Sequence, residues 1–388
     1  MTETAPLAGV RVVDFTHVLA GPYCTMLLAD AGAEVIKVEP PGGEFARGRG
    51  ARREMAPGEW VSAYYVAVNR GKLSVEVDLK TDKGREMVHD LIHRSDVVVE
   101  NYSRGTMSKL GLDFSALRAE DPRLITASIS LFGPFASPEV RATARLGLAL
   151  VAEAEAGLFA QGMDPDEPPE PVSAAVGDMI TGLACYAGIV TAIAGREQTG
   201  LGRHVDISMT QSLLSTNVAN MLTQQMLRAH GQELSPEESI RQSVTAPYGF
   251  YRCRDGLVAI AVNNDKTWQA LLEALGRLDL ADDPRYTFRD DRNPRVEEVR
   301  QIVEEAIGGT SKREVVDLLV AARVPCGLVR RSWELSDDPE LEASGSYAWV
   351  DDGFGTRYRT PSNPFGFDTN GRTVPRLNDY MARPTDSH

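Results

Sequence analysis

The sequence predicts an α/β protein in which a doubly wound parallel sheet is combined with a smaller α+β domain. The chain has 388 residues, more than one compact core usually holds. Short apolar runs alternate with helical patterns through the first 130 residues, which is typical of parallel βαβ units. A hairpin signal then marks a change of pattern near residue 248. We therefore expect a large domain at residues 1–225, a small domain at 226–330 and a return segment at 331–388 that completes the large domain.

The elements of the large domain are predicted from its apolar runs. Residues 10–15 predict a buried strand, and Pro22 is suited to the first turn of a helix that ends near Gly32. Helices dominate residues 145–215, apart from a loop at 164–171 rich in Pro, Asp and Glu. The remaining predicted elements are strands at 34–38, 73–79, 96–99, 124–129 and 204–209 and a helix at 83–94.

The small domain is predicted from a hairpin. Asp255-Gly256 lies between strand patterns at residues 248–252 and 257–262, and this dipeptide favours a tight turn. Residues 361–375 contain several Pro, Gly and Asn residues, so we expect an extended tail that packs on the rest of the chain. Helices of the small domain are expected at residues 267–275, 296–307 and 312–322.

Composition and charge restrict the partners of the protein. The net charge of −14 argues against a nucleic-acid partner and against an anionic membrane surface. The N-terminus has no basic segment followed by an apolar core, and the longest apolar stretch, residues 182–195, is too short to span a bilayer. The four cysteines are far apart, which favours free thiols in a reducing compartment. We therefore expect a cytoplasmic protein with no membrane partner.

Several familiar catalytic motifs are missing from the sequence. The loop after the first strand, residues 16–22, lacks G-x-G-x-x-G, which argues against an NAD-dependent oxidoreductase. The sequence contains no H-E-x-x-H and no G-x-S-x-G. His89 and His93 have the i, i+4 spacing of helical metal ligands, but no third ligand is apparent. We therefore expect a polar helix face there and no metal site.

Polar side chains follow several predicted strands, at the edge where a doubly wound sheet binds its ligand. They occur in residues 69–72, 78–80 and 100–105. Basic side chains there could bind phosphates, and Tyr102 offers a flat face for a base, but ordinary polar strand caps are an equal alternative. A further basic cluster either binds an anion or forms a solvated or ion-paired surface loop. It comprises Arg47, Arg49, Arg52 and Arg53.

Asp178 lies where a helix rich in small residues should begin. Two roles are open for its carboxylate. Aspartate is a favoured N-cap residue and needs no other function. Alternatively, helix-end amides would keep the carboxylate ionised, and Gly177 and Gly182 would let a bulky ligand approach the backbone, so that Asp178 could act as a nucleophile.

Taken together, these segments resemble the family III CoA-transferases (the CaiB/BaiF family), which include formyl-CoA and crotonobetainyl-CoA transferases. The similarity runs from about residue 7 to residue 345, and the ordered set of motifs is more specific than any one of them. The motifs are Pro6-Leu7-Ala8-Gly9-Val10-Arg11-Val12-Val13-Asp14, Ala20-Gly21-Pro22, Gly32-Ala33-Glu34-Val35-Ile36-Lys37-Val38-Glu39, Asp96-Val97-Val98-Val99-Glu100-Asn101-Tyr102, Gly177-Asp178, Arg196-Glu197-Gln198-Thr199-Gly200-Leu201-Gly202-Arg203 and Ala246-Pro247-Tyr248-Gly249.

The resemblance implies a Rossmann-like large domain made of the N- and C-terminal parts, a small middle domain, and two subunits interlocked as rings in a homodimer. It implies that Asp178 is the nucleophile, a role compatible with helix capping. Acyl-CoA and a carboxylic acid would be the substrates, with an aspartyl mixed anhydride and an aspartyl-CoA thioester as intermediates and no tightly bound cofactor. Backbone amides of residues 177–179 are expected to stabilise the oxyanions. The implied CoA contacts are Leu19, Ala20, Val77, Lys80, Asn101, Tyr102, Ser103 and Lys109, to which we add Arg47, whose loop would bring it close to the thioester or carboxylate.

The sequence also departs from the family pattern. Formyl-CoA transferases carry a glutamine where Leu19 stands, and residues 238–246 are short and lack the glycines of their long loop, so oxalate and formate are not favoured. An α-methylacyl-CoA racemase shares the fold, but its Gly-His-Asp motif is replaced here by Gly147-Leu148-Ala149, and Leu148 cannot carry a proton. A non-catalytic CoA-binding subunit of a hetero-oligomer remains a third alternative.

Overall fold

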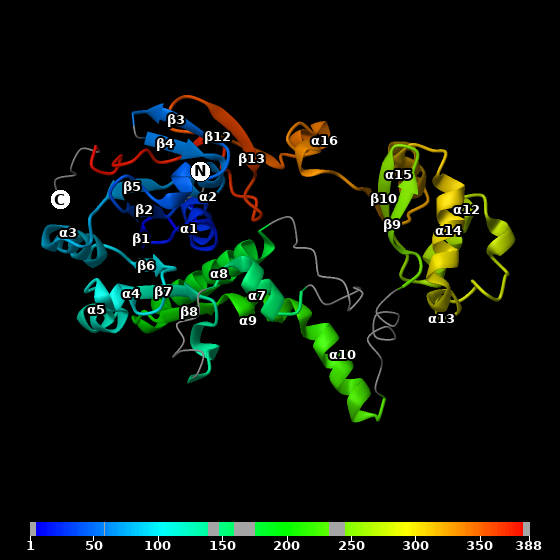
Figure 1. Ribbon diagram of the computed structural model, residues 1–388, viewed down its shortest axis with the longest axis horizontal. Coiled ribbons are helices and arrows are strands. Elements are labelled where there is room, and N and C mark those ends of the chain that lie inside the picture. The colour runs from blue at the N-terminus through cyan, green and yellow to red at the C-terminus, as the bar shows by residue number, and fades with distance from the viewer. Residues whose placement is uncertain (1–4, 58, 139–146, 159–174, 233–244, 383–388) are drawn as a thin grey trace. The chain divides into compact units, whose positions relative to one another are not determined.

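The computed structural model describes residues 5–57, 59–138, 147–158, 175–232 and 245–382 (Figure 1). The chain divides into two compact units: unit 1 comprises Met1–Met221 and Pro339–His388, and unit 2 comprises Leu222–Asp338. The boundaries expected from the sequence, 225 and 330, differ from these by four and eight residues. The loop expected at 164–171 and residues 238–244 of the short segment lie outside the described residues.

Unit 1 is built on a sheet of six parallel strands in the order β5-β2-β1-β6-β7-β8 (Figure 1). Each strand predicted from an apolar run of the large domain is present, and the α/β class with a parallel sheet is confirmed. The strands are β1 (Arg11–Asp14), β2 (Glu34–Glu39), β5 (Leu73–Glu76), β6 (Val97–Glu100), β7 (Ile125–Ser130) and β8 (His204–Ser208).

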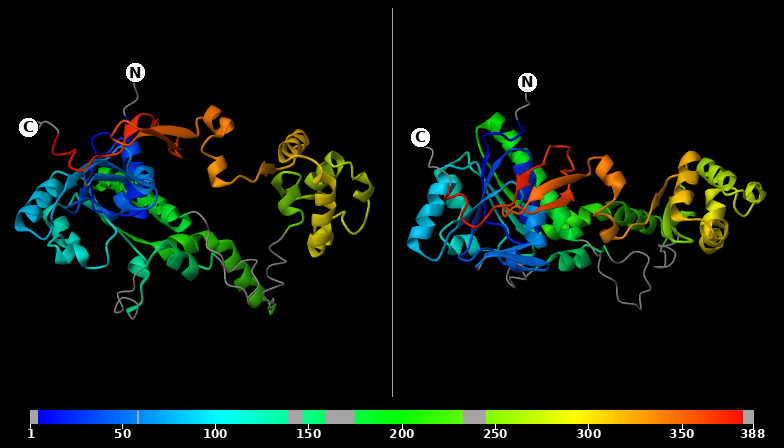
Figure 2. Two further views of the ribbon diagram at one scale, coloured as in Figure 1. Left: turned by 45° about the horizontal axis from the view of Figure 1, so that its top comes forward. Right: turned by 90° about the horizontal axis from the view of Figure 1, so that it is seen from above.

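Helices cover both faces of this sheet. The first face carries α1 (Ala20–Asp30), α7 (Ala149–Glu155), α8 (Val176–Thr199) and α9 (Met209–Leu214); the second carries α3 (Asp82–His93), α4 (Thr106–Lys109) and α5 (Phe114–Glu120). Strand β1 shows the separation, because successive side chains point to opposite faces. Val12 packs with α1 and α8, whereas Val13 packs with α3 and α5. In Figure 2 the green helix α8 and the cyan helices lie on opposite sides of unit 1.

The strand order reverses between β1 and β6. In open α/β sheets such a reversal leaves a crevice beyond the carboxyl ends of the two strands, and ligands bind there. The carboxyl end of β1 continues into residues 15–19, and that of β6 continues into residues 101–105. These two loops therefore border the position at which the fold binds ligands.

Helix α8 is longer than the apolar stretch of about 14 residues recognised in the sequence. By length and composition alone it could cross a membrane, since it has 24 residues and a mean hydropathy of 1.6 in its most apolar part. However, Cys185, Ile189 and Ala192 lie on one face of α8 and are buried in the core of unit 1. We therefore describe α8 as a core helix of the first face.

The return segment adds a three-stranded sheet to unit 1, made of β12 (Tyr347–Asp351), β13 (Arg357–Pro361) and β14 (Arg372–Thr373). Through Val350 and Val374 it packs against α2 (Ala63–Asn69) and β4 (Glu59–Ser62), which forms a hairpin with β3 (Arg52–Ala56). The sequence predicted only an extended tail at 361–375, so these strands were missed.

The end of the described chain covers an edge of the main sheet. The N–H of Tyr380 donates to the carbonyl of Ser74 in β5 (3.0 Å), and the Asn378 side chain accepts from the N–H of Glu76 (2.7 Å). Unpaired edge strands are prone to pairing with other chains, so this segment protects β5.

Unit 2 has a core of its own. Its antiparallel sheet contains β9 (Tyr248–Cys253), β10 (Gly256–Ala261) and β11 (Cys326–Leu328), and β9 and β10 form the predicted hairpin. Trp268, fully buried, is the largest side chain of this core. The helices that lie wholly in unit 2 are α12 (Asp265–Ala274), α13 (Arg289–Arg292), α14 (Val296–Ile307) and α15 (Lys312–Ala321). Helix α10 (Val218–Ala229) spans the first unit boundary, and α16 (Pro339–Ala343) directly follows the second.

Candidate active site

Asp178 is the third residue of α8 and lies in its first turn. The helix begins at Val176 with Ala175 as its N-cap, so the interpretation of Asp178 as the N-cap residue is wrong. Neither Ala175 nor Val176 is a residue type that signals a helix start, which is why the sequence misplaced the boundary. Asp178 is half-buried, so part of the residue is accessible from outside the core.

A second carboxylate, that of Glu153 in α7, is buried beside the start of α8. Its Oε1 accepts a hydrogen bond of 2.9 Å from the N–H of Gly177, and only 3 % of Glu153 is exposed. Burial and, to a smaller extent, the negative charge of Glu153 raise the pKa of Asp178 to about 6. These effects oppose the helix-end amides that we expected to favour ionisation, but at neutral pH the ionised carboxylate still predominates.

Two of the amides expected to stabilise oxyanions already have partners. The N–H of Gly177 donates to Glu153, and the N–H of Met179 donates to the carbonyl of Ala175 at 3.0 Å. Because each amide has a single proton, neither is free to bind an oxyanion in this arrangement. The expectation for these two amides is therefore corrected.

The start of α8 is tied to the start of α1 through Gly182. A Cβ atom built on Gly182 would lie 2.5 Å from the carbonyl oxygen of Ala20 and 3.0 Å from the ring of Tyr23. Asp178 and Gly182 are four residues apart and share one face of the helix. Asp178 is therefore one helical turn from the contact between α8 and the first turn of α1, which follows the loop at the carboxyl end of β1.

The loop between β1 and α1, residues 16–19, is held by side chains from three other segments of the chain. The Nζ of Lys37 donates to the carbonyl of Thr16 (2.6 Å), and Glu44 accepts from the N–H of Val18 (3.1 Å). Val18 has a φ of +69°, which is strained for a β-branched residue. The loop keeps this conformation because side chains outside the loop hydrogen-bond its backbone groups.

Asn101 supplies the third restraint on the loop. Its amide accepts from the N–H of His17 and donates to the carbonyl of His17, both at 2.9 Å. The His17 ring also stacks on Tyr102, with 5.2 Å between ring centres. Asn101 thus joins the carboxyl ends of β1 and β6 across the switch point, and its amide holds the loop.

The remaining predicted contact residues follow the carboxyl ends of β1, β5 and β6 or lie in α1 and α4. Leu19 and Ala20 are buried, so contacts from them would involve backbone atoms. Val77, which follows β5, is 5 % exposed. The side chains of Lys80, Ser103 and Lys109 are exposed and accessible to a charged ligand.

Arg47 is buried and its guanidinium is bonded to other side chains of unit 1. It is 4 % exposed, and its Nε and Nη2 each bond an oxygen of Glu39 at 2.7 Å, with a further bond of 2.6 Å to the hydroxyl of Tyr65. Burial opposes the ionisation of Glu39, but the hydrogen bonds and the positive charge of Arg47 outweigh burial. The pKa of Glu39 is therefore lowered to about 2. We therefore interpret Arg47 as a structural residue, whereas Arg49, Arg52 and Arg53 are exposed, as the surface interpretation expected.

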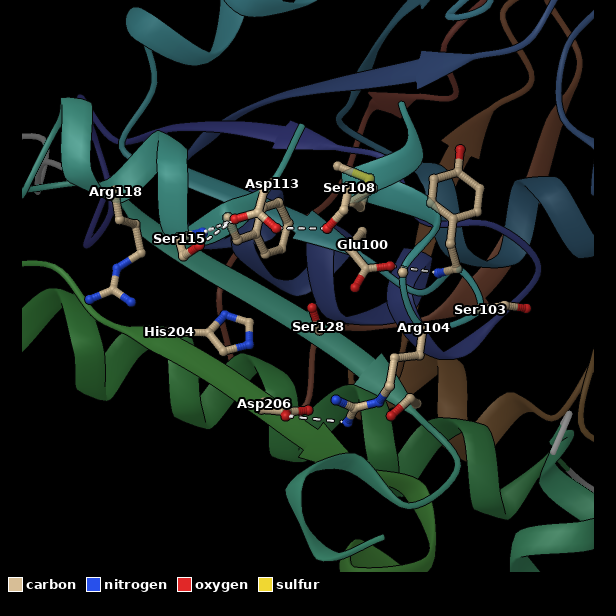
Figure 3. A pocket seen from close by; sticks show the side chains of 15 residues that line it. Glu100, Ser103, Arg104, Ser108, Asp113, Ser115, Arg118, Ser128, His204 and Asp206 are labelled. Carbon is tan, nitrogen blue, oxygen red and sulfur yellow. Dashed lines mark hydrogen bonds and ion pairs between the residues drawn. The ribbon is translucent and has the colours of Figure 1, made fainter. Parts of the chain in front are cut away.

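A cavity of about 400 Å³ lies on the second face of the sheet, over β6, β7 and β8 (Figure 3). It includes the predicted residues Tyr102 and Ser103. Burial, outweighing a hydrogen bond from Ser128, raises the pKa of Glu100 at its base to about 7. Its lining residues are Glu100, Tyr102, Ser103, Arg104, Gly105, Met107, Ser108, Asp113, Phe114, Ser115, Arg118, Ser128, Ser130, His204 and Asp206.

Most of these lining residues were missed in the sequence. Ser128 and Ser130 alternate with apolar residues in β7, and His204 and Asp206 do so in β8. When polar and apolar residues alternate along a strand, the polar side chains share one face of the sheet. That pattern predicts that this face is not covered by an apolar core. That signal was present, but the adjacency of β7 and β8 was needed to interpret it.

Comparison with known proteins now identifies the family. Residues 7–378 match the sequence profile of CoA-transferase family III. The chain belongs to this family. The resemblance noted in the sequence is confirmed, and the protein is an enzyme, a CoA-transferase.

Similar proteins and a similar solved structure support the assignment to family III. The chain is 37 % identical to "Succinyl-CoA:mesaconate CoA-transferase" of Haloarcula marismortui, over 89 % of this chain and 85 % of the relative. It is 34 % identical to "Succinate--glutarate CoA-transferase" of Agrobacterium fabrum, over 97 % of this chain and 94 % of the relative. A CaiB/BaiF family protein from Brucella suis superposes with a TM-score of 0.81 at 30 % identity, over 98 % of each chain.

Proposed function

We propose that this family III chain moves CoA from an acyl-CoA to a carboxylic acid with Asp178 as the nucleophile. The observation that carries the proposal is the position of Asp178, half-buried and one helical turn from the contact of α8 with the first turn of α1, which directly follows the loop at the switch point. The carboxylate is mostly ionised at neutral pH, as a nucleophile requires.

The proposed reaction has four acyl transfers that balance without an external proton or electron. An oxygen of Asp178 attacks the donor thioester, the C–S bond breaks, and a mixed anhydride and CoA thiolate result. The thiolate attacks the Asp178 carbonyl carbon, which releases the donor acid and leaves an aspartyl-CoA thioester. The acceptor carboxylate then displaces the thiolate to give a second anhydride. Finally the thiolate attacks the acceptor carbonyl, which yields the new acyl-CoA and the free Asp178 carboxylate.

The CoA moiety would lie across the carboxyl ends of β5, β1 and β6. Lys80 and Lys109 supply positive charge for the phosphates, and Tyr102 and Ser103 supply an aromatic face and a hydroxyl. Leu19 and Ala20 contribute backbone groups, and Val77 an apolar wall. Asn101 acts through the His17 loop that it holds.

The proposed substrates are the CoA ester of one dicarboxylic acid and a second, free dicarboxylic acid. The two relatives described above are named for succinyl-CoA with mesaconate and for succinate with glutarate. We infer a succinyl-CoA donor and a dicarboxylate acceptor for this chain as well. Leu148, which stands where a racemase carries its proton-carrying histidine, is apolar, so racemisation lacks a second proton carrier.

The enzyme is proposed to be a cytoplasmic interlocked homodimer. All four cysteines are free thiols, which supports a reducing compartment. In α10, Val218, Met221, Leu222 and Met226 are exposed at helical spacing, and such an apolar stripe supports burial against another subunit.

A CoA-exchange assay tests the proposed activity. The purified chain is incubated with succinyl-CoA and, separately, mesaconate, glutarate or oxalate, and the CoA esters are separated by chromatography. We expect mesaconyl-CoA or glutaryl-CoA and little oxalyl-CoA. No transfer to any acid, together with deuterium uptake at the α-carbon of a branched acyl-CoA in heavy water, would favour the racemase instead.

A further inference from the structure

Glu153 contacts the backbone beside Asp178 directly. A Cβ atom at Gly177 would lie 2.8 Å from Oε1 and 3.2 Å from Cγ of Glu153, so only glycine lets the two groups approach this closely. The hydrogen bond from the Gly177 N–H to Glu153 satisfies one of the donors that a helix N-terminus leaves unpaired. Glu153 therefore fixes the first turn of α8 from a neighbouring helix.

Among the described residues, Glu153 is the charged side chain whose field acts on Asp178. The facing part of α1 contributes Tyr23 and Cys24, one turn farther along α8, and α9 carries no ionisable side chain. A buried carboxylate beside a nucleophilic carboxylate is unfavourable for the ionised ground state, because like charges repel.

We propose that Glu153 is a positioning residue that holds the nucleophile turn and, through its negative charge, favours the acylated forms of Asp178. The inference rests on the proposed role of Asp178 as nucleophile. The mixed anhydrides and the aspartyl-CoA thioester all lack the negative charge of free Asp178. Repulsion from Glu153 is relieved each time one of them forms, so Glu153 makes Asp178 more basic and more reactive and increases the fraction of enzyme in the covalent state.

Glu153→Gln separates the charge from the hydrogen bond. The amide oxygen can still accept from Gly177, so the turn keeps its cap, but the repulsion is gone. The test is the rate and amount of covalent CoA adduct on the enzyme, followed by intact mass from pH 4.5 to pH 8 after addition of succinyl-CoA. In the wild type we expect the rate to fall as the pH drops through about 6. In Glu153→Gln the midpoint should move to lower pH, and the plateau rate and the adduct fraction should fall several-fold, without a matching change in KM for succinyl-CoA.

The matched control is Glu155→Gln, which removes the same charge from an exposed residue of the same helix. It should leave the midpoint and the adduct fraction at the wild-type values. A Glu153→Gln enzyme that forms adduct with an unchanged midpoint and amount would overturn this inference and leave the nucleophile in place. If the wild type transfers CoA but forms no adduct, that result contradicts the proposed role of Asp178 as nucleophile and therefore this inference as well.

Discussion

Gly182 in α8 lies against the main-chain carbonyl of Ala20 in α1, so closely that a Cβ atom on Gly182 would be 2.5 Å from that oxygen. This contact joins the helix that carries Asp178 to α1, which directly follows the loop at the carboxyl end of β1. The distance between the nucleophile and the proposed CoA-binding loop therefore depends on two backbones in van der Waals contact, with no flexible side chain between them.

Gly182→Ala is expected to force α1 and α8 apart. The atom in the way is a backbone oxygen, so the steric clash can be removed only if one of the helices shifts. We expect the free energy of unfolding to fall by about 1–3 kcal/mol. KM for succinyl-CoA should rise as the loop moves. Gly195→Ala in the same helix is the control, because a Cβ there meets no atom within 4 Å. Chemical denaturation should find that control unchanged or more stable, by up to about 1 kcal/mol.

Asn101→Ala is expected to release the loop around His17. The two hydrogen bonds of the amide are lost, each worth about 1 kcal/mol, and the strained conformation of Val18 is less well held. KM for acyl-CoA should therefore rise about tenfold or more, with a smaller change in kcat. Asn101→Asp keeps the acceptor and loses the donor, so its KM should lie between those of wild type and alanine variant. Equal KM values in all three enzymes would contradict the restraint.

The ion pair of Arg47 and Glu39 is expected to govern stability in acid. Since the folded-state pKa of Glu39, about 2, is below its ordinary value of 4.5, the ionised form stabilises the fold above pH 4.5. This stabilisation is lost as the pH falls from 4.5 towards 2. Arg47→Met should cost about 3–5 kcal/mol at neutral pH, because it leaves Glu39 buried and unpaired. The double variant Arg47→Met/Glu39→Gln should recover part of that loss in urea titrations.

The same variants distinguish a structural role of Arg47 from a role in substrate binding. If Arg47 is structural, KM for succinyl-CoA should stay near wild type in the double variant once the protein is folded. A large increase in KM with no loss of stability would restore Arg47 to the substrate site.

Elements with a clear hydrophobic period were predictable from the sequence. Helix α14 begins and ends at the residues expected, because Val299, Val303 and Ile307 repeat at helical spacing on its buried face. The parallel strands were predictable because a strand that is buried on both faces of the sheet has a nearly continuous run of apolar residues such as Val and Ile. The hairpin of β9 and β10 was found from Asp255-Gly256, whereas the same signal at Asp352-Gly353, in the loop between β12 and β13, was overlooked.

The site was less predictable because its geometry depends on contacts between distant segments. The sequence pointed to Asp178 but could not reveal Glu153, whose role depends on the packing of α7 against the start of α8. Arg47 was placed near the substrate from the position of its loop; its partner Glu39 ends a different element and faces it only after folding. Asn101 was expected to bind CoA directly, yet its amide is used to hold His17.

The central claim is that Asp178 becomes covalently attached to CoA, and intact mass measures this most directly. Wild type and Asp178→Ala are each incubated with succinyl-CoA, quenched in acid and weighed by mass spectrometry. The wild type should gain the mass of CoA minus one water, and hydroxylamine should release this thioester. The variant should gain nothing and transfer no CoA. An adduct of equal amount on both proteins, or undiminished CoA transfer by Asp178→Ala, would contradict the account.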